Sequence, residues 1–356
     1  MLFSFVNLAS NMIQKDQNAF MAFISRILGF IFGFFFNIAY AFTENNSLGI
    51  AIILITIVVR LCMVPTGFSQ QKSSRKMALI QPEINKIKEK YGNTKDPELL
   101  RKQQMEISQI NAKNGVNMLG GCLPVLFTMP LFIALVYILR QSYLFVDPIN
   151  QLYTEIADVF YSLPDIEAIK SVIIGKIPKG MEFHPGDMKD MLKAINAFNA
   201  EDWKNILAAI PEQAGTLQGL LDKKQSIEYF IGFNLIENCG FAFPGIIIPI
   251  LSAVTSFFTS LLSMKSQSSA NADPAAQSSQ KMMMYAMPAM MFFFTLNVSA
   301  GVGVYWTVSN VFGVVQQYLM NKYYKYDPKT EKEKPKEPKF LTEKRALPDK
   351  KYPKNR

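Results

Sequence analysis

Histidine and cysteine are scarce in this chain of 356 residues, and their scarcity limits the chemistry that we expect of it. The single histidine is His184, and the three cysteines, Cys62, Cys122 and Cys239, show no metal-ligand spacing. We therefore expect neither a zinc site nor a cofactor. No nucleophile has a base at a suitable spacing, and there is no carboxylate pair or phosphate-binding loop, so we expect no covalent catalysis.

Charge is also scarce and unevenly distributed. Charged residues make up 18% of the chain and hydrophobic residues 49%, and long segments carry almost no charge. Such segregation is typical of an all-α polytopic membrane protein. The apolar runs predict five transmembrane helices, at residues 48–66, 119–140, 243–263, 282–299 and 302–320.

The charges of the connecting segments predict the orientation. Ten basic residues stand against five acidic ones from Gly67 to Met118, and thirteen against six from Asn321 to Arg356. Gln141 to Phe243 instead has eight basic and fourteen acidic residues. Because lysine and arginine accumulate on the cytoplasmic side, the first two segments and the short loop 264–281 are predicted to be cytoplasmic. The acidic loop 141–242 and the N-terminus then lie outside, and the C-terminus lies inside.

Arg60 is the one charge in the first apolar run, LGIAIILITIVVRLCMV from Leu48 to Val64. A charge near the centre of a span costs about 2.5 to 3.5 kcal/mol and is usually paired or hydrated. At about 1.5 Å per residue, Arg60 lies about 18 Å from Leu48 and about 6 Å from Val64, which places it in the inner half of the membrane. The guanidinium either snorkels to the nearby interface or lines a hydrated pocket open to the cytoplasm.

A pocket would need polar companions from the other spans. Thr56 stands one turn before Arg60 on the same helix face. Taken singly, each candidate is a weak signal, because serine and threonine often bond their own backbone. The predicted groove residues are Arg60, Thr56, Thr128, Tyr305, Trp306, Ser309 and Asn310.

Residues 67–118 predict a helical hairpin on the cytoplasmic side. Apolar residues recur at spacings of three and four from Met77 to Ile87 and from Leu100 to Ile110, as in an antiparallel pair. Gly92 is expected to end the first helix, and Asp96 to cap the second ahead of Pro97. The hairpin is either simply solvated or a recruitment surface for lipid headgroups or an RNA-rich partner. The recruiting residues would be Lys72, Arg75, Lys76, Lys86 and Lys88.

The two ends of the chain are also distinctive. Residues 321–356 form a lysine- and proline-rich tail, which we expect to be disordered and either a tether for anionic lipid or ribosomal RNA or merely solubilising. Residues 1–47 contain an apolar run that is either an outer interfacial helix or a signal peptide cleaved after Ala41. Within the outer loop, Tyr153 to Leu221 is an acidic insertion with helical patterns that suit a small accessory domain.

Three segments carry a resemblance to a known family. They are ITIVVRLCMVPTGFSQQKSSRKMALIQPEINKIKEKYG, NGVNMLGGCLPVLFTMPLFIALVYIL and VYWTVSNVFGVVQQYLM. An arginine within a span followed by a QPEI hairpin resembles the YidC membrane protein insertases and their mitochondrial and thylakoid relatives. The resemblance spans residues 27–145 and 226–325 in order.

The resemblance implies five helices around a hydrophilic groove that is open to the cytoplasm and lipid, in the plasma membrane of a bacterium. Arg60 matches the groove arginine, Thr56 the polar position one turn earlier, and Tyr305 or Trp306 the aromatic positions of the last span. Thr128 departs from the glutamine usual in the family, so this side of the groove presents a smaller polar group. The segment before the first span would be an interfacial helix on the outer side.

The implied function is the insertion and folding of small membrane proteins, without a covalent reaction. The implied partners are nascent membrane proteins, the ribosome through the basic tail, the Sec translocon and anionic lipids, with no specific nucleic-acid sequence. Two alternatives are a small-anion transporter that uses Arg60 and a structural assembly factor. A transporter usually shows an internal repeat, and none is found in this sequence.

Overall fold

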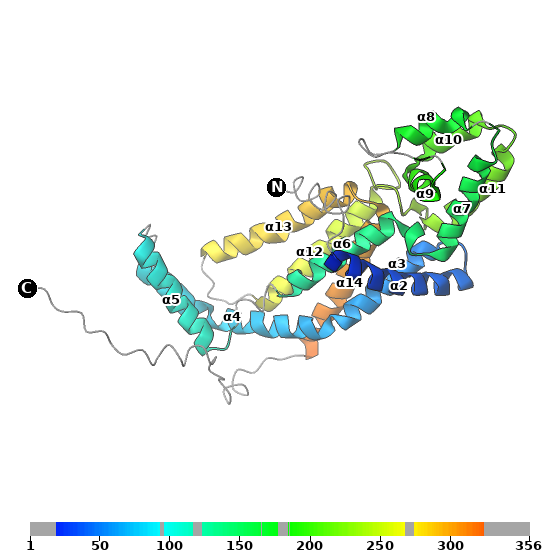
Figure 1. Ribbon diagram of the computed structural model, residues 1–356. Helices are drawn as coiled ribbons and strands as arrows, with labels where there is room; N and C mark the ends of the chain where they lie inside the picture. Colours follow the sequence, from blue (N-terminus) through cyan, green and yellow to red (C-terminus); the bar gives the residue numbers. More distant parts are fainter. Residues whose placement is uncertain are drawn as a thin grey trace, which may run out of the picture.

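The computed structural model describes residues 19–92, 96–116, 123–164, 166–176, 184, 186–267 and 274–323. The predicted signal-peptide start, Cys122 and the tail beyond Tyr323 lie outside the described residues. Those described are mostly helical, and Figure 1 shows a bundle with a two-helix arm at one end and a cluster of short helices at the other. The all-helical class predicted from the sequence is confirmed.

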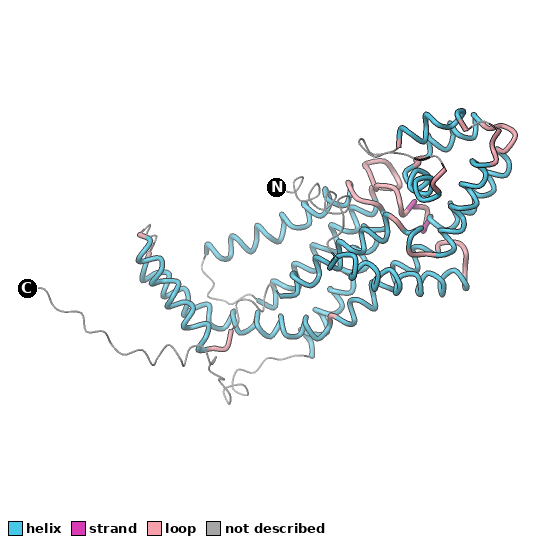
Figure 2. The backbone as a smooth tube through the Cα atoms, viewed as in Figure 1, coloured by secondary structure: helices cyan, strands magenta, loops and turns pink. Residues whose placement is uncertain are grey.

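The bundle consists of long helices that pack on one another in sequence-distant pairs. Helix α12 packs against α13 and α14, α14 also contacts α3, and α2 packs against both α3 and α6. Figure 2 shows these helices as the body of the molecule. Their bounds are α2 Ala19–Phe42, α3 Ser47–Cys62, α6 Leu123–Arg140, α12 Ile247–Gln267, α13 Pro274–Leu296 and α14 Ala300–Tyr323.

Among the described residues, two helical segments are long and apolar enough to cross a membrane. These are Phe23–Phe42 in α2 and Ile247–Met264 in α12, and a third span is possible if α3 and α4 are counted as one bent pair. The apolar parts of α6 and α13, Thr128–Arg140 and Met284–Leu296, are shorter. Helix α14 has 24 residues, but serine, asparagine and two glutamines lower its hydropathy. The structure therefore supports two or three spans by length and composition, fewer than the five predicted.

The arm is the helical hairpin predicted from the sequence, formed by α4 (Val64–Tyr91) and α5 (Pro97–Lys113). Gly92 ends α4 with a φ of 55°, and the Asp96 carboxylate accepts a hydrogen bond from the Glu98 amide at 2.9 Å, as predicted. The seam contains Ile80 and Ile84, but Leu100, expected in it, is exposed. Leu100 lies in the first turn of α5, at the end where the two helices are joined.

Helix α4 follows α3 almost without interruption. Only Met63 separates them, and their axes meet at a bend of 52°. Pro65, in the first turn of α4, has no amide hydrogen and so cannot continue the hydrogen-bond ladder of α3. The span predicted at 48–66 and the hairpin predicted at 67–118 are thus one bent helical path.

The cluster at the other end is formed by the loop predicted to lie outside and is called the outer domain below; its core is continuous with that of the bundle. Tyr153, Ile156, Phe160, Ile195 and Ile206 are fully buried in it. The helices expected in the acidic insertion are present as α9 and α10, each begun by an Asp or Asn cap. The elements are η2 Ser142–Leu144, α7 Asp147–Tyr161, α8 Glu167–Gly175, α9 Met188–Ala197, α10 Ala200–Ala209, α11 Ala214–Glu228, β1 Tyr229–Phe230 and β2 Phe233–Asn234.

A small antiparallel hairpin, β1 and β2, joins the outer domain to the bundle. Tyr229 pairs with Asn234 in its register. Phe230 packs on the start of α3, where a Cβ at Gly49 would lie 2.2 Å from its ring. Glycine at position 49 therefore lets the hairpin sit directly on the helix that carries Arg60.

Helix α2 has one face buried against the bundle and one face exposed. Phe32 and Phe36 are fully buried, whereas Phe30 is 79% exposed. A Cβ at Gly29 would lie 2.2 Å from the Phe145 ring, and one at Gly33 would lie 2.7 Å from the Phe145 carbonyl oxygen. These glycines, which interrupt the apolar run in the sequence, allow close approach of the segment that follows α6.

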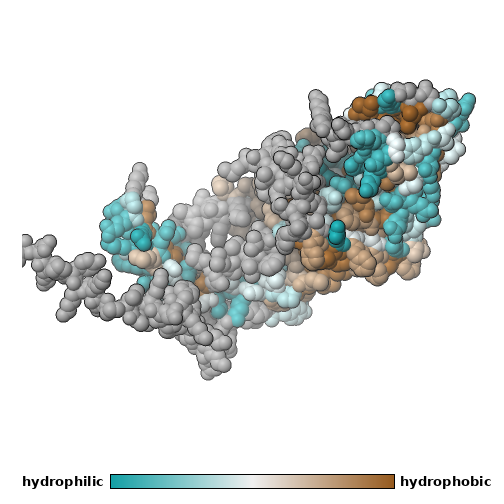
Figure 3. Space-filling view, in the orientation of Figure 1, coloured by the Kyte–Doolittle hydropathy of each residue, from teal (hydrophilic) through white to brown (hydrophobic). Residues whose placement is uncertain are grey.

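The ends of the molecule differ from its body in surface character. In Figure 3 the visible bundle surface beside the outer domain is mostly hydrophobic, and the α4–α5 arm is largely hydrophilic. The arm and the outer domain lie at opposite ends of the bundle (Figure 1). This is the arrangement that the predicted cytoplasmic hairpin and outer loop require.

Candidate functional site

The charge that the sequence singled out is held by a residue from the last helix. Arg60 stands in the last turn of α3, and its Nε donates a hydrogen bond to Ser309 Oγ of α14 at 2.6 Å. Ser309 is buried. Among the described residues Arg60 has no carboxylate partner, so its charge is compensated by polar groups and not by an ion pair.

Arg60 lines a cavity of about 230 Å³ between α3, α4, α6, α12 and α14. Since one water occupies about 30 Å³ of liquid volume, such a cavity has room for several waters. Arg60 is the single charged residue among the described residues that line it. The lining consists of Arg60, Met63, Thr66, Gly67, Gln70, Gln71, Ser74, Thr128, Thr259, Ser263, Gly313, Gln316, Gln317 and Met320.

Most of the polar lining was not singled out from the sequence, although a signal was present. On α4 the lining residues between Met63 and Ser74 recur at spacings of three and one, and Gly313 to Met320 on α14 does the same. Such spacing is one helix face. The glutamine pairs at 70–71 and 316–317 interrupt otherwise apolar or weakly polar runs, and they could have marked the groove.

Of the predicted groove residues, Arg60, Ser309, Tyr305 and Thr128 come together: the Tyr305 side chain is hydrogen-bonded to Ser309 and lies close enough to Arg60 to interact with its charge. Thr128 lines the Arg60 cavity from α6. Its side chain is half-buried, and it takes the place where the family resemblance led us to expect a larger amide. The polar character that glutamine would supply there comes instead from the glutamines of α4 and α14.

Thr56 does not lie in this cavity. It is buried, and its hydroxyl donates to the Ile52 carbonyl of its own helix. It lines a separate small cavity with Tyr305, Leu28, Val59 and other apolar residues. Sharing a helix face with Arg60 was therefore not sufficient to bring Thr56 to the same site.

Trp306 and Asn310 also face other neighbours. The Trp306 ring packs edge-on against Phe132 with centroids 5.2 Å apart, and Phe294 lies beside both. Asn310 Nδ2 donates to the Ser252 carbonyl at 3.4 Å and to Thr255 Oγ1 at 3.3 Å. These two residues fix α14 against α6, α12 and α13.

Beyond the cavity, Asn321 ties α14 to the arm. Its Oδ1 accepts hydrogen bonds from Gln71 Nε2 at 3.0 Å and Arg75 Nη2 at 3.2 Å, both on α4. Gln317 of α14 also donates to it, at 3.1 Å. One amide oxygen thus joins the start of the arm to the end of the last helix.

The basic residues predicted for recruitment fall into two groups. Lys86 and Lys88, on the part of α4 farther from the bundle, are exposed. Lys72, Arg75 and Lys76, nearer the bundle, are half-buried. The exposed pair is the part of the set that a partner could reach directly.

Catalytic or metal chemistry finds no support in the residues that the structure describes. No group of three or more His, Cys, Asp and Glu side chains there could hold a metal ion. Cys62 and Cys239 are free thiols, and His184 lies 3.6 Å from Asp190 on the outer domain. What the Arg60 cavity can do is bind and release an anionic or polar group through one guanidinium and neutral hydrogen-bonding side chains.

Comparison with known proteins shows the family of the chain. The family described as 60Kd inner membrane protein matches residues 38–329. A membrane protein insertase YidC of Oceanobacillus iheyensis is 27% identical over 286 residues, covering 80% of this chain and 78% of the relative. YidC of Enterococcus faecalis is 29% identical over 282 residues, covering 79% and 69%. MisCA of Bacillus subtilis, also a membrane protein insertase, is 25% identical over 276 residues, covering 78% and 71%.

These relatives are named as insertases and not as enzymes, which is consistent with a site that holds one arginine among neutral side chains. The family match begins before α3 and continues past α14, so it includes every helix that lines the Arg60 cavity. The chain belongs to the 60Kd inner membrane protein family, the family of the YidC membrane protein insertases.

Proposed function

We propose that this bacterial membrane protein inserts small membrane proteins into the bilayer through the Arg60 cavity. The observation that carries the proposal is a single guanidinium, held by Ser309, in a cavity otherwise lined by neutral side chains. A charge without a carboxylate partner is able to attract an acidic group from another molecule. The insertase names of the relatives support the same function.

In the proposed mechanism, Arg60 attracts the acidic outer segment of a substrate into the inner half of the membrane. Because the attraction comes from one hydrated charge, the segment can leave again towards the outside. The apolar helix of the substrate meanwhile moves into lipid along exposed apolar rows of α12 and α14. These rows are Ile250, Val254 and Phe258 on α12 and Val311, Val315 and Tyr318 on α14.

The proposed arrangement has five crossings, made by α3, α6, α12, α13 and α14, with the N-terminus outside and the C-terminus in the cytoplasm. The charges of the connecting segments support it. So does the position of the arm and the outer domain at opposite ends of the bundle (Figure 1). The cavity lining continues along the first part of the arm, at Thr66, Gln70 and Ser74 of α4. This supports an opening on the cytoplasmic side.

Helix α2 has two proposed placements, and one observation favours each. The sequence resemblance supports a helix in the outer interface. The length and apolarity of Phe23–Phe42 support a sixth crossing, which would bring the N-terminus to the cytoplasmic side. A reporter fused to the N-terminus and probed from either side of the membrane separates the two. In both cases we propose that α2 is retained, because cleavage after Ala41 would remove Phe32 and Phe36 from the core.

We further propose that the arm recruits substrates through Lys86 and Lys88 and meets anionic lipid headgroups. The exposure of both lysines supports this role. The basic tail would hold the ribosome near the cytoplasmic face, and the protein would act alone or with the Sec translocon. The excess of basic residues in 321–356 supports the contact with ribosomal RNA.

Reconstitution tests the proposed function. Vesicles that contain this protein alone should insert a single-span substrate with an acidic outer segment faster than protein-free vesicles do. Flux of a small anion without faster insertion would indicate a transporter. Stable binding of the substrate with neither effect would indicate an assembly factor. Either result would overturn the insertase proposal.

A further inference from the structure

The outer domain contains a second cavity, of about 400 Å³, which the proposed insertion path does not use. It lies between α10, α11 and the segment that follows β2. Its volume falls within the range of ligand pockets, about 300 to 1,000 Å³. The lining consists of Asn196, Phe198, Ala200, Trp203, Lys204, Leu207, Gln218, Leu221, Lys224, Gln225, Glu228, Tyr229, Asn234, Ile236 and Glu237.

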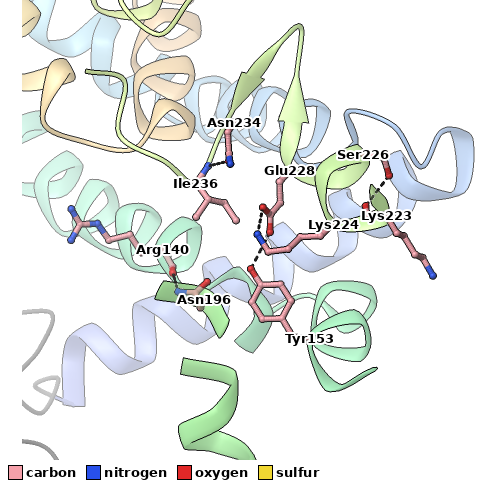
Figure 4. A network of polar contacts seen from close by, with 9 residues as sticks. All are labelled: Arg140, Tyr153, Asn196, Lys223, Lys224, Ser226, Glu228, Asn234 and Ile236. Carbon is pink, nitrogen blue, oxygen red and sulfur yellow. Dashed lines mark hydrogen bonds and ion pairs between the residues drawn. The ribbon is translucent and has the colours of Figure 1, made fainter. Parts of the chain in front are cut away.

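A buried carboxylate fixes one side of this outer pocket. Glu228 is 2% exposed; it accepts a hydrogen bond from the Tyr153 hydroxyl at 3.0 Å and pairs with Lys224. Figure 4 shows Tyr153 and Lys224 reaching Glu228 while Lys223 points away from it. Burial raises the pKa of Tyr153 well above its usual range, so this hydroxyl stays a donor. The group holds the end of α11 against α7.

Asn196 anchors the side of the pocket that faces the end of α6. Its Nδ2 donates to the Arg140 main-chain carbonyl at 2.8 Å (Figure 4). Its Oδ1 is buried and has no hydrogen-bond partner among the described residues. Because this oxygen is closed to solvent, a molecule in the pocket does not reach it, and Asn196 contributes to the lining through the rest of its side chain.

The remaining wall is apolar and aromatic. Trp203 packs edge-on against Phe198 with ring centroids 5.0 Å apart, and Leu207, Leu221 and Ile236 complete the wall. The formal charges of the lining balance, with two lysines against two glutamates. This balance disfavours a strongly anionic or cationic ligand. It suits a neutral chain of amide groups that carries a large apolar side chain.

The pocket adjoins the first turn of α14, the helix whose Ser309 is hydrogen-bonded to Arg60. The Glu237 carbonyl accepts a hydrogen bond from the Ala300 amide at 2.8 Å, and the Leu235 carbonyl accepts one from the Gly301 amide at 2.8 Å. Ile236, between them, lines the pocket. One wall is thus attached to the first turn of α14, the helix of Ser309. The pocket is thus next to the bundle at the end away from the arm.

We propose that the outer pocket binds an extended polypeptide segment, with a large apolar side chain against Trp203 and Leu221 and main-chain groups beside the polar lining residues Gln225 and Asn234. That this segment is the outer part of an inserted protein rests on the proposed function. The pocket then holds the delivered segment on the outer face and opposes its return.

Trp203 provides a direct readout. The chain has two tryptophans, so Trp306→Phe leaves Trp203 as the only source of tryptophan fluorescence. The full chain in lipid nanodiscs is titrated with a short capped serine- and threonine-rich peptide that carries one central leucine. We expect a saturable change in emission. The same peptide with aspartate in place of leucine should give none, because the wall is apolar.

A matched pair of variants localises the binding. Ala200 and Ala208 are both exposed on α10, but Ala200 alone of the two lines the pocket. Ala200→Phe should abolish the change, and Ala208→Phe should retain it. Gln225→Phe, which fills the pocket from α11, should repeat the loss, so that a local defect at position 200 does not decide the result.

Several outcomes would overturn the proposal. These are no response to the leucine peptide, an equal response to the aspartate peptide, and full binding by both pocket-filling variants. A saturable response to a chito-oligosaccharide but not to the peptide would make the pocket a glycan site. The titration contains no insertion step, so its failure leaves the insertase proposal standing, and failed insertion in vesicles leaves the titration interpretable.

Discussion

Arg60 Nε and Ser309 Oγ lie 2.6 Å apart, although the two residues are 249 positions apart in the chain. The bond joins the first predicted span to the last and fixes one nitrogen of the guanidinium. Among the described residues the structure records no further hydrogen bond from Arg60, so its two Nη groups are free to face the cavity. Ser309 therefore positions the guanidinium through its Nε without neutralising the positive charge, and the two Nη groups stay available to a ligand.

Two replacements of Arg60 should show whether insertion depends on its positive charge or on the shape of the guanidinium. Arg60→Ala removes a charged donor worth about 1.5 to 3 kcal/mol, so insertion of an acidic-tailed substrate should fall about ten- to hundredfold. Arg60→Lys keeps the charge but not the fork of donors, and should retain much of the activity. Insertion rates in vesicles measure both. Parental rates for Arg60→Ala would refute an electrostatic role, and a neutral-tailed substrate is the control.

Ser309→Ala should slow insertion because it changes the orientation of the Arg60 guanidinium. The variant removes the hydroxyl that orients the guanidinium, so the insertion rate should fall several-fold, less than in Arg60→Ala. In the double variant, Ser309→Ala should add nothing to Arg60→Ala, because the oriented group is already absent. The check is a double-mutant cycle of insertion rates. Additive losses would mean that Ser309 acts independently of Arg60.

Thiol labelling should distinguish the two cavities near Arg60. In a background lacking the native cysteines, Thr128→Cys should react with a water-soluble thiol reagent added from the cytoplasmic side, because Thr128 lines the polar cavity. Thr56→Cys should react far more slowly, because Thr56 is buried among apolar side chains. Mass spectrometry of inverted vesicles measures the labelled fraction. Equal labelling at both positions would contradict the separation of the cavities.

Asn321→Ala should loosen the arm. It removes the acceptor shared by Gln71 and Arg75, and each lost hydrogen bond is worth about 0.5 to 1.5 kcal/mol. Hydrogen exchange should then quicken in the part of α4 nearest the bundle. Asn85→Ala is the matched control, since Asn85 accepts a bond from Gln81 within α4 itself. Unchanged exchange in Asn321→Ala would show that the contact does not restrain the arm.

Local signals predicted local structure well. Gly92, Asp96 and Pro97 marked the turn of the hairpin, because each favours a backbone position that few other residues suit. The caps at Asp187 and Asn199 begin the two helices expected in the outer insertion. Arg60 stood out because a charge in an apolar run is costly wherever its partners lie.

Which neighbour a side chain faces could not be predicted from one helix. Thr56 and Trp306 lie on helices that line the groove, but one faces a small apolar cavity and the other an aromatic cluster. The glutamines at 316–317 are visible in the sequence as polar residues in an apolar helix. They belong to the same site as the glutamines at 70–71 only because α4 and α14 both line the cavity. The outer pocket depends on residues from 196 to 237 that meet through tertiary packing, which periodicity does not encode.

The bent path from α3 into α4 has a mechanical consequence. A hairpin on a loose loop could sample a wide volume, but this arm is joined to the span by a single residue, Met63, and is fastened to α14 through Asn321. Rotation of the arm about Met63 would have to break the contacts with Asn321, so we expect the arm to move less freely than a hairpin on a loop. If the arm recruits substrates as proposed, its connection to the span places the point of rotation three residues after Arg60.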